Sequence, residues 1–353
     1  MAKILMKGNE AIGAAAIKAG CRYFFGYPIT PQNEVPEYMA RELPKVGGVF
    51  LQAESEVAAI NMVYGASGAG ARVMTSSSSP GIALKQEGIS YIAGAELPCV
   101  VVNVVRGGPG LGGIQPAQSD YYQATRGGGN GDYRMPVYAP SSIQETVDLI
   151  MGAFDVADQY RTPVMILADG MIGQMMEPIE FKEPKKRELA PKTWATTGTK
   201  DERKPNIINS LFIDPQELED HCIRLEKKYD LIAQNECLVE EYKLEGAEIV
   251  VAAYGTTSRI VKNAIDKCAE LGIKVGLIRP ITLWPFPFAS FEKIEDTTKA
   301  VLTVEMSTGQ MIDDVKIAMN GRMPVEFYGR TGGMVPTPDA IVEKIKKIVG
   351  GEK

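Results

Sequence analysis

The chain has 353 residues, of which 45% are hydrophobic and 23% are charged, and its formal net charge is −6. This length and hydrophobic content predict about two domains with large cores. The acidic balance argues against nucleic-acid binding, and no apolar run approaches the roughly 18 residues of a membrane helix.

Short apolar runs alternate with helical patterns through the first half of the chain. These runs predict strands at residues 21–27, 47–53, 71–77, 99–105 and 162–169. Longer periodic stretches, such as residues 142–160, predict the helices between them. The alternation predicts an α/β fold in which helices cover both faces of a parallel sheet, and we place this first domain at residues 1–180.

A rigid turn follows the first of these predicted strands. It has the sequence GYPITP and spans residues 26–31. Because Pro28 and Pro31 restrict the backbone, the turn presents the hydroxyl group of Thr30 in a fixed direction.

Glu56 stands at the start of a segment that carries almost no charge until Arg72. The segment predicts a helix that is buried on most sides, with Glu56 at its entrance. A buried carboxylate is costly unless a partner takes up its charge or its proton, so Glu56 is either a working acid or a helix cap. The residues alone favour the cap, because either Glu54 or Glu56 could interact with the helix N-terminus, for about 0.3 to 1 kcal/mol.

A hydroxyl-rich run, TSSSSPG, occupies residues 75–81, and two glycine-rich segments follow at 107–113 and 126–132. Such a hydroxyl run typically caps the next helix, which we expect to begin near Gly81. The glycine-rich segments lack the spacings of nucleotide-binding loops, so they predict flexible or closely approached backbone. Their position after a strand end favours a lid or a subunit contact.

The composition changes between residues 178 and 205, where Lys, Glu, Pro and Thr are frequent and apolar periodicity is absent. This change predicts a linker or extended arm, and the basic cluster at 182–186 predicts a solvated surface. A charged helix is predicted at 215–234, and its His221, the only histidine, is expected to face solvent. We assign residues 181–245 to this linker and helical arm.

Residues 246–353 predict a second doubly wound domain. Its strands are expected at 247–255, 275–281, 299–306 and 324–330, and its helices at 256–272 and 311–321. The turn at residues 255–258 could bind an anion, such as part of coenzyme A, through helix N-terminal amides. Helix capping is the expectation that we adopt for it.

The five cysteines are widely spaced and form no CxxC pair, so they predict neither a metal cluster nor a zinc site in this chain. The start of the chain is charged and shows no signal peptide. Both features predict a reducing, cytoplasmic location.

Motifs spread over nearly the whole chain resemble one enzyme family. These motifs are GYPITP, QAESE before an alanine-rich helix, TSSSSPG, ELPCVVVNVVRGGPG and LIRPITLWPFP. They are similar to the alpha subunit of the thiamine diphosphate-dependent 2-oxoacid:ferredoxin oxidoreductases. Residues 27–39 and 106–134 look most like the branch that acts on 3-methyl-2-oxobutanoate (2-ketoisovalerate), with the 2-oxoglutarate branch next.

This resemblance implies a fold with two domains, the first of the thiamine diphosphate pyrimidine-binding type and the second like the C-terminal domain of transketolase. It places on Glu56 the carboxylate that hydrogen-bonds to N1′ of the pyrimidine ring and promotes its tautomerisation. Glu54 is the nearest competitor for that role. The resemblance also implies that Thr30 lies near the substrate and the thiazolium ring.

Further contacts are implied by the same resemblance. Tyr27, Pro28 and Ile29 in the turn, and Ser78 and Ser79 in the hydroxyl run, are expected to contact the cofactor.

Arg106 occupies the place of the arginine that binds the substrate carboxylate. An ordinary charge at a strand terminus is an equally good interpretation of Arg106.

The chain lacks the GDG motif with a later Asn that holds magnesium and diphosphate, since its one Gly-Asp pair, Gly131-Asp132, continues into Tyr and Arg. We therefore expect no metal site here. In the family, a beta subunit carries the Mg²⁺, the diphosphate and an iron-sulfur cluster. The expected partners are this beta subunit, a gamma subunit, a ferredoxin-like subunit and ferredoxin.

The predicted function is the CoA-dependent oxidative decarboxylation of a branched 2-oxoacid, with reduction of ferredoxin. One alternative is the corresponding subunit for 2-oxoglutarate, and another is a thiamine enzyme without redox activity. A third alternative, from a different class, is a non-catalytic scaffold paralogue that keeps the fold.

Overall fold

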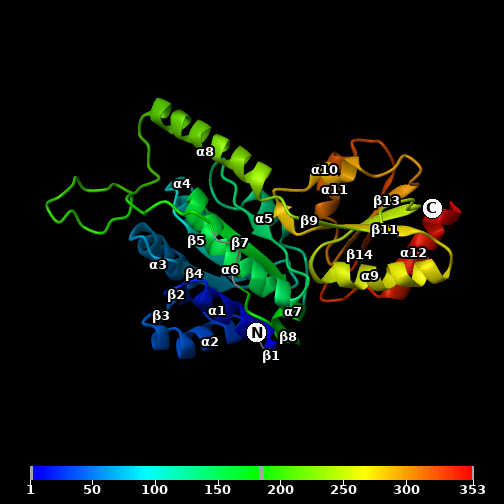
Figure 1. Cartoon of the computed structure of the whole chain (residues 1–353), viewed down its shortest axis with the longest axis horizontal. Helices are drawn as coiled ribbons and strands as arrows, with labels where there is room; N and C mark the ends of the chain where they lie inside the picture. The colour runs from blue at the N-terminus through cyan, green and yellow to red at the C-terminus, as the bar shows by residue number, and fades with distance from the viewer. Residues whose placement is uncertain (1–2, 183–186, 352–353) are drawn as a thin grey trace.

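The computed structural model describes residues 3–182 and 187–351, which form two α/β domains that lie side by side (Figure 1). Residues 183–186, and with them most of the basic cluster, lie outside the described residues. Within the described ranges, every helix is too short or too polar to cross a bilayer.

A seven-stranded sheet forms the centre of the first domain, in the order β12-β6-β7-β5-β4-β2-β3. In that order the strands are Thr282–Trp284, Val137–Tyr138, Pro163–Asp169, Cys99–Val105, Val73–Ser77, Tyr23–Gly26 and Val49–Gln52. All neighbouring pairs are parallel except β12 with β6. Because the chain runs outward from β2 to β3 and then returns to continue through β4 and β5, the sheet is doubly wound, as predicted.

Helices cover this sheet. They are α1 (Gly8–Lys18), α2 (Glu34–Glu42), α3 (Glu56–Gly68), α4 (Ser79–Gly94), α5 (Tyr121–Arg126), α6 (Ile143–Tyr160) and α7 (Gly170–Gln174), with a short 3-10 helix at Pro44–Val46. The helix α1 packs against α6, and α3 packs against α4. The core between the layers is continuous, since β5 and β7 are buried along their full length.

A small antiparallel pair of strands and a long arm complete this half of the chain. The pair consists of β1 (Ile4–Lys7) and β8 (Met176–Ile179). After β8, the arm leaves the first domain at the left of Figure 1 and returns to the helix α8 (Pro215–Asn235). The arm touches the first domain where Thr196 N–H donates a 2.9 Å hydrogen bond to the carbonyl oxygen of Gly68.

The second domain is built on a five-stranded sheet in the order β14-β13-β10-β11-β9. In that order the strands are Val325–Gly329, Ala300–Glu305, Ile249–Ala252, Val275–Pro280 and Val239–Tyr242. Its helices are α9 (Gly255–Glu270), α10 (Phe288–Glu292), α11 (Met311–Met319) and α12 (Pro338–Gly350). Only the edge strand β9 is antiparallel to its neighbour, so this sheet is also the predicted parallel, doubly wound type.

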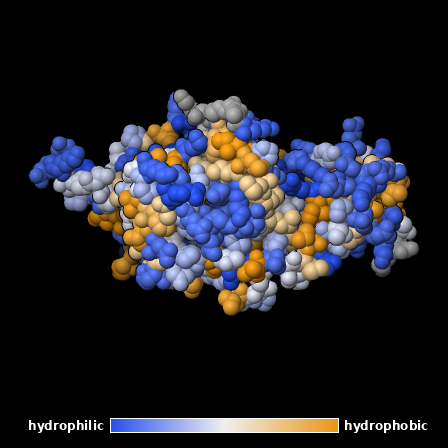
Figure 2. Space-filling model, turned by 90° about the horizontal axis from the view of Figure 1, so that it is seen from below, coloured by the Kyte–Doolittle hydropathy of each residue, from blue (hydrophilic) through white to orange (hydrophobic). Residues whose placement is uncertain are grey.

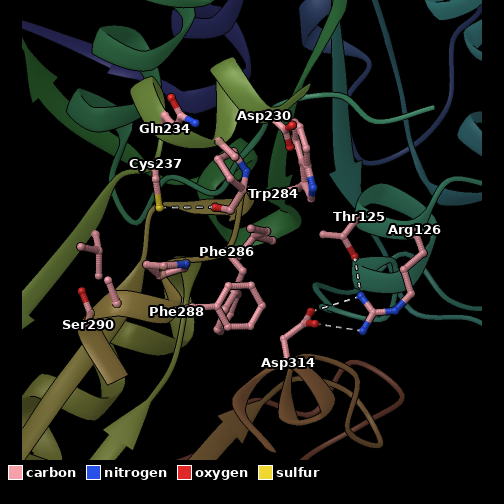
Figure 3. Close-up of a pocket in the computed structure, with 16 residues that line it drawn as sticks. Thr125, Arg126, Asp230, Gln234, Cys237, Trp284, Phe286, Phe288, Ser290 and Asp314 are labelled. Carbon is pink, nitrogen blue, oxygen red and sulfur yellow. Dashed lines mark hydrogen bonds and ion pairs between the residues drawn. The ribbon is translucent and has the colours of Figure 1, made fainter. Parts of the chain in front are cut away.

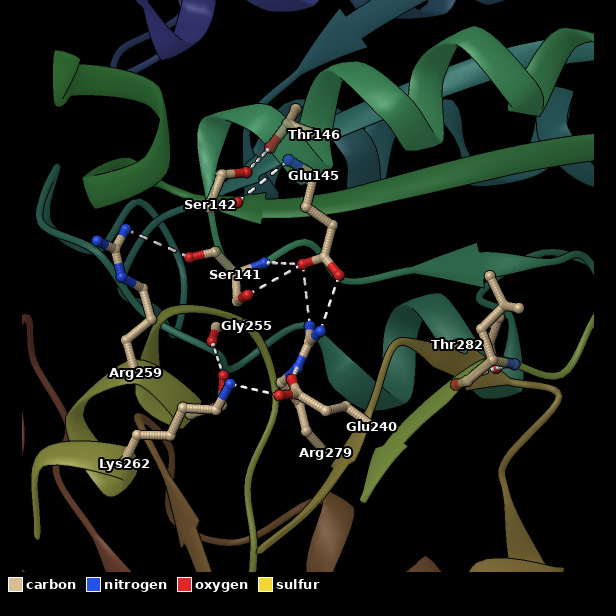
Figure 4. A network of polar contacts seen from close by, with 12 residues as sticks. Ser141, Ser142, Glu145, Thr146, Glu240, Gly255, Arg259, Lys262, Arg279 and Thr282 are labelled. Carbon is tan, nitrogen blue, oxygen red and sulfur yellow. Dashed lines mark hydrogen bonds and ion pairs between the residues drawn. The ribbon is translucent and has the colours of Figure 1, made fainter. Parts of the chain in front are cut away.

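Buried polar contacts join the two domains. The guanidinium group of Arg279 donates two hydrogen bonds of 2.8 and 2.9 Å to Glu145 on α6 and one of 2.6 Å to Glu240 on β9 (Figure 4). The amide of Gln118 donates to the carbonyl oxygen of Tyr254 and accepts a hydrogen bond from the hydroxyl group of Thr257. These charge-assisted and buried bonds fix how the domains meet.

The turn at 255–258 belongs to this interface. Thr256, Thr257 and Ser258 are all buried in the first turn of α9, and the N-cap residue Tyr254 makes no side-chain cap bond. The expectation of helix capping is therefore wrong. The hydroxyl group of Thr257 donates to Gln118 of the first domain, and that of Ser258 donates to the carbonyl oxygen of Gly255, so both are already engaged.

Candidate functional site

The carboxyl ends of neighbouring strands bring the predicted site residues to one edge of the first sheet. Thr30 follows β2, Glu56 follows β3, Ser78 and Ser79 follow β4, and Arg106 follows β5. The winding reverses between β2 and β4, and doubly wound sheets bind ligands in the crevice outside the strand ends at such a reversal. The topology therefore gathers these residues at a binding crevice.

Glu56 is the first residue of α3, and its side chain is buried, with 7% of the residue's surface exposed. The N-cap of α3 is Ser55, whose hydroxyl oxygen accepts a 3.2 Å hydrogen bond from the backbone N–H of Ala58. Glu54 is exposed. Capping is thus performed by Ser55, and the carboxylate of Glu56 has no hydrogen-bond partner among the described residues.

Gly81 makes room for that carboxylate. A Cβ atom on Gly81 would lie 2.6 Å from Glu56 Oε1 and 2.1 Å from Ser77 Oγ. These distances are too short for any side chain, so the glycine lets Glu56 and Ser77 approach the start of α4. The hydroxyl groups of Ser77 and Ser78 are buried beside it and have no hydrogen-bond partner among the described residues.

The hydroxyl-rich run differs from the prediction in its local structure. The strand β4 extends to Ser77 and α4 begins at Ser79, so Ser78 is the only residue between them. Ser78 is the N-cap by position but makes no side-chain cap bond. Helix capping is therefore the wrong interpretation of this run, and the unpartnered hydroxyl group of Ser77 lies beside Glu56 Oε1 at Gly81 instead.

The helix α3 is buried on one side only, contrary to the prediction. Ala59, Ile60 and Val63 are buried, whereas Val57 and Asn61 are exposed. The uncharged sequence predicted a helix that is covered on most sides, but no described residue covers the outer side of α3.

The GYPITP turn lies at the open side of the site. Tyr27, Pro28 and Thr30 are exposed, and Ile29 is half-buried. The turn is fixed from below, since Arg106 Nη1 donates a 2.9 Å hydrogen bond to the carbonyl oxygen of Thr30. The hydroxyl group of Thr30 therefore stands at the surface of an anchored turn.

Arg106 is a buried cation without an acidic partner among the described residues. Its Nη1 and Nη2 atoms donate to the backbone carbonyl oxygens of Thr30 and Leu111, both at 2.9 Å, and its Nε has no partner. Because an unpaired buried charge is costly, this arrangement favours an anion-binding role for Arg106 over that of an ordinary charge at a strand end. A carboxylate is the anion that fits the planar guanidinium group best.

A polar cluster that the sequence analysis did not assign supports Arg106. The hydroxyl oxygen of Ser79 accepts a 3.1 Å hydrogen bond from the backbone N–H of Arg106, and Asn103 Oδ1 accepts one from the N–H of Ser79. Asn103 Nδ2 donates a 2.8 Å bond to Asp120. Burial raises the pKa of the Asp120 carboxyl group, and the hydrogen bonds from Ser79 and Asn103 oppose that shift.

A cavity of about 620 Å³ adjoins this cluster. Its walls come from both domains and include Ser79, the loop at 107–110, Asp120, Met306 and Thr308. The first glycine-rich segment thus lines a cavity between the domains, and its role as a lid remains a prediction. The second segment lies on α4, where Gly128 N–H donates to the side-chain oxygen of Gln86.

Lys85 is a second buried cation near Glu56 that the sequence analysis missed. Its Nζ atom donates a 2.9 Å hydrogen bond to the hydroxyl oxygen of Thr75, and the residue is completely buried. Burial lowers the pKa of Lys85 to about 8, and the charge of Glu56 opposes that shift. The signal available in the sequence was a lysine four residues after Gly81 in an otherwise apolar stretch.

The residues present fit one half of a thiamine diphosphate site. The carboxylate of Glu56 and the two unpartnered serine hydroxyl groups near Gly81 suit a polar heterocycle. No group of three or more His, Cys, Asp or Glu side chains within the described ranges could hold a metal ion. Where the diphosphate and its Mg²⁺ are bound stays a prediction.

A larger cavity, of about 750 Å³, lies apart from these residues, between α8, α5 and the loop that contains Trp284 (Figure 3). Its two main charged groups neutralise each other, because Arg126 donates two 3.1 Å hydrogen bonds to Asp314. Its other lining residues include the aromatic side chains of Trp284, Phe286 and Phe288, with Phe286 and Phe288 at one side (Figure 3). Neither Glu56 nor Arg106 lines it.

His221 is buried, so the prediction that it faces solvent is wrong. Its Nε2 atom lies 2.8 Å from the carbonyl oxygen of Gly94, and its ring stacks on Phe212 at a centroid distance of 4.7 Å. Burial lowers the pKa of the imidazole. The histidine packs α8 and the end of the arm onto the first domain and is far along the chain from any site residue.

Comparisons with known proteins place this geometry among characterised families. The model for "Pyruvate flavodoxin/ferredoxin oxidoreductase, thiamine diP-bdg" matches residues 14–238, and the model for "Pyruvate:ferredoxin oxidoreductase core domain II" matches residues 247–341. The chain is 50% identical over 350 residues to the ketoisovalerate oxidoreductase subunit VorB of Methanothermobacter marburgensis, with 99% of both chains covered.

Two further relatives are more distant. The chain is 36% identical to the 2-oxoglutarate synthase subunit KorA of Methanothermobacter thermautotrophicus, covering 97% of this chain and 98% of that one. It also superposes, with a TM-score of 0.84 and 30% identity, on a solved 2-oxoglutarate:ferredoxin oxidoreductase from Magnetococcus marinus with 2-oxoglutarate, coenzyme A and succinyl-CoA bound. That match covers 98% of this chain but only 65% of the solved chain.

Proposed function

The chain belongs to the family of pyruvate flavodoxin/ferredoxin oxidoreductases, and from this premise we propose that it is the alpha subunit of a 2-oxoacid:ferredoxin oxidoreductase. The proposed reaction is the CoA-dependent oxidative decarboxylation of 2-ketoisovalerate to the branched acyl-CoA and CO₂, with reduction of ferredoxin. The higher identity to the VorB subunit than to the KorA subunit supports the branched-chain substrate.

The observation that carries this proposal is the buried carboxylate of Glu56, which lacks a hydrogen-bond partner in the described chain and points to the start of α4 beside Gly81. Bound thiamine diphosphate supplies a carbon nucleophile, which forms when its own pyrimidine ring assists deprotonation of the thiazolium ring. Glu56 would hold the shared proton at ring nitrogen N1′, and its buried surroundings would strengthen this hydrogen bond.

Neighbouring residues would orient the ring. Tyr27, Pro28 and Ile29 offer the surface of the anchored turn, and the unpartnered hydroxyl group of Ser78 offers a hydrogen bond. Ser79 would support the ring only indirectly, because its hydroxyl group is already hydrogen-bonded to the backbone of Arg106.

Arg106 and Thr30 are the proposed substrate groups. The guanidinium group of Arg106 would bind the carboxylate that all 2-oxoacids share, and its unpartnered Nε is a free donor for this purpose. The hydroxyl group of Thr30 stands above it and would donate to the ketone oxygen. The other buried cation, Lys85, does not line the cavity beside Arg106, so this chain offers no obvious second cation there for a dicarboxylate.

The chain would need a partner to complete the site. We propose a beta subunit that holds the diphosphate, the Mg²⁺ and an iron-sulfur cluster, together with a gamma subunit, a ferredoxin-like subunit and ferredoxin as electron acceptor. The exposed apolar residues Tyr27, Leu51, Val57 and Leu84 lie on the turn and the elements that carry the site residues, and they suit such a contact. On the underside of the molecule, exposed hydrophobic residues form separate patches, while the tip of the arm is hydrophilic (Figure 2).

All five cysteines are free, and three of them are buried, which suits a reducing cytoplasm. The decisive experiment is turnover of the purified complex with CoA, ferredoxin and a panel of 2-oxoacids. Preference for 2-ketoisovalerate over pyruvate and 2-oxoglutarate is the expected result. A clear preference for 2-oxoglutarate would overturn the branched-chain substrate while leaving the family in place, and turnover without ferredoxin reduction would favour a thiamine enzyme of another class.

A further inference from the structure

Lys85 is a fully buried lysine whose only hydrogen bond within the described chain joins it to Thr75. It makes no ion pair with any described residue, although Glu56 is close enough for its charge to act on the lysine. Burying an ammonium group without a direct counter-ion is costly, and an apolar side chain in this helix would avoid that cost. The lysine therefore calls for an explanation beyond packing.

The geometry directs Lys85 toward Glu56. Gly81 and Lys85 are four residues apart on α4, so they lie on the same face of the helix, and helical side chains lean toward the N-terminus. The position above Gly81 is where Glu56 Oε1 lies. Lys85 therefore extends along the face of α4 that Glu56 approaches.

Hydroxyl groups on β4 line the path between the two charges. Thr75 and Ser77 are two positions apart on the strand and therefore share one face. Thr75 accepts the hydrogen bond from Lys85, and Ser77 Oγ, which has no partner, lies beside Glu56 Oε1 at Gly81. An ammonium group, two hydroxyl groups and a carboxylate thus follow one another beneath the site.

No other charge competes in this arrangement. The elements packed against α4 carry the titratable groups of Glu56 and Tyr64 on α3, Cys99 on β5, Asp169 on β7, and Arg126, Asp132 and Tyr133 in and beside the second glycine-rich segment. Of these, only Glu56 affects the pKa of Lys85, which burial lowers to about 8. The lysine is therefore a cation at neutral pH whose field acts on one acid.

We propose that Lys85 is a positioning residue for Glu56, whose ammonium group keeps Glu56 ionised and oriented, so that the shared proton resides on the pyrimidine ring nitrogen of the cofactor. The inference rests on the proposed role of Glu56. Burial favours the neutral form of a carboxyl group, and a nearby cation favours the charged form. With Lys85 charged, the carboxylate is ready to accept the ring N–H.

Proton uptake during cofactor binding tests this directly and does not depend on turnover. We would titrate thiamine diphosphate with Mg²⁺ into the assembled complex by calorimetry, in buffers of different ionisation enthalpy. Under this proposal the wild type should take up about one proton per site at pH 7. Lys85→Met should take up about half as much or less. The difference should vanish at pH 9, where Lys85 in the wild type is itself neutral.

Matched variants separate this inference from its premise. Glu87→Gln removes an exposed charge from the same helix and should leave the uptake unchanged, whereas Glu56→Gln should abolish it. Lys85→Gln retains a hydrogen bond to Thr75 and should give the same reduced uptake where Lys85→Met fails to assemble. Wild-type uptake in either neutral variant would overturn the role of Lys85. Undiminished uptake in Glu56→Gln would instead overturn the role of Glu56.

Discussion

Arg106 Nη1 donates a 2.9 Å hydrogen bond to the carbonyl oxygen of Thr30, and this bond ties the end of β5 to the turn that follows β2. The two residues are 76 positions apart in the sequence, and each is proposed to bind the substrate. The bond uses the backbone of Thr30, so its hydroxyl group stays available. One guanidinium group can therefore hold the turn and still offer its Nε to a substrate.

Arg106→Met should weaken the use of every 2-oxoacid to a similar extent. Loss of a desolvated charge pair costs about 2 to 5 kcal/mol, which lowers kcat/KM by roughly 30-fold to several thousand-fold. The preference among substrates should not change, because the carboxylate is common to all of them. Steady-state kinetics with the substrate panel provides the measurement, and the exposed Arg41→Met on α2 is the control. A change in preference would show that Arg106 contacts the variable part of the substrate.

Glu56→Gln should leave the fold intact and lower kcat by roughly 10² to 10⁴, because a glutamine cannot hold the proton at the ring nitrogen. Glu54→Gln is a close control, since Glu54 lies two residues away and is exposed. It should lose far less activity. Circular dichroism and turnover of the assembled complexes check both parts, and full turnover in Glu56→Gln would favour a scaffold paralogue.

Gly81→Ala should impair the same step by a steric route. The added methyl group would meet Ser77 Oγ at 2.1 Å and Glu56 Oε1 at 2.6 Å, so both side chains must move. Because both contacts are with side-chain ends, we expect a folded complex with kcat reduced about 10-fold or more. Gly65→Ala on the exposed side of α3, where an added methyl group meets nothing, is the control. Normal turnover in Gly81→Ala would place the working position of Glu56 elsewhere.

The motifs predicted the family and the fold class because both follow from local patterns. The strand runs and the turn residues are contiguous in sequence, and the family matches and the doubly wound sheets confirm both predictions. The edge strands β9 and β12 were not predicted. Each is short and pairs with a strand distant in the chain, so no local hydrophobic pattern predicts it.

The failures at His221 and Ser78 have a common physical origin. The sequence shows His221 on a charged helix, but its burial comes from Phe212 and Gly94, which are remote or outside that helix. Ser78 has the composition of a cap, yet β4 and α4 leave it as the only linking residue and its hydroxyl group without a partner. Lys85 was missed for the same reason, since its burial depends on how α3 and β4 meet α4.

The isolated chain should bind thiamine diphosphate weakly or not at all. The described residues supply the groups for the pyrimidine end and no cluster that could hold a metal ion. Most of the cofactor's charge is in the diphosphate, which needs Mg²⁺ and its own donors. Calorimetry with the full chain, before and after addition of the partner subunit, is the measurement. Tight, Mg²⁺-dependent binding to this chain alone would contradict the shared site.

Lys85 should leave a signature in the pH dependence of stability. The pKa of Lys85 is about 8 in the folded chain, below the usual lysine value of 10.5. Between these two pH values the unfolded state therefore binds more protons than the folded state. The free energy of unfolding should therefore rise as the pH increases from 8 to 10.5. The charged lysine destabilises the folded state fully below pH 8, and this effect is lost as the lysine becomes neutral.

Lys85→Met should abolish that rise. The difference between the pKa of Lys85 in the folded and in the unfolded state corresponds to about 3 kcal/mol. The free energy of unfolding of the variant, relative to that of the wild type, should therefore fall by about that amount between pH 7 and pH 10.5. Denaturant unfolding of the full chain at several pH values measures it, with the exposed Lys45→Met as control. Parallel pH profiles for Lys85→Met and the wild type would show that Lys85 has an ordinary pKa, and its charge would then be matched by a partner that this geometry does not place beside it.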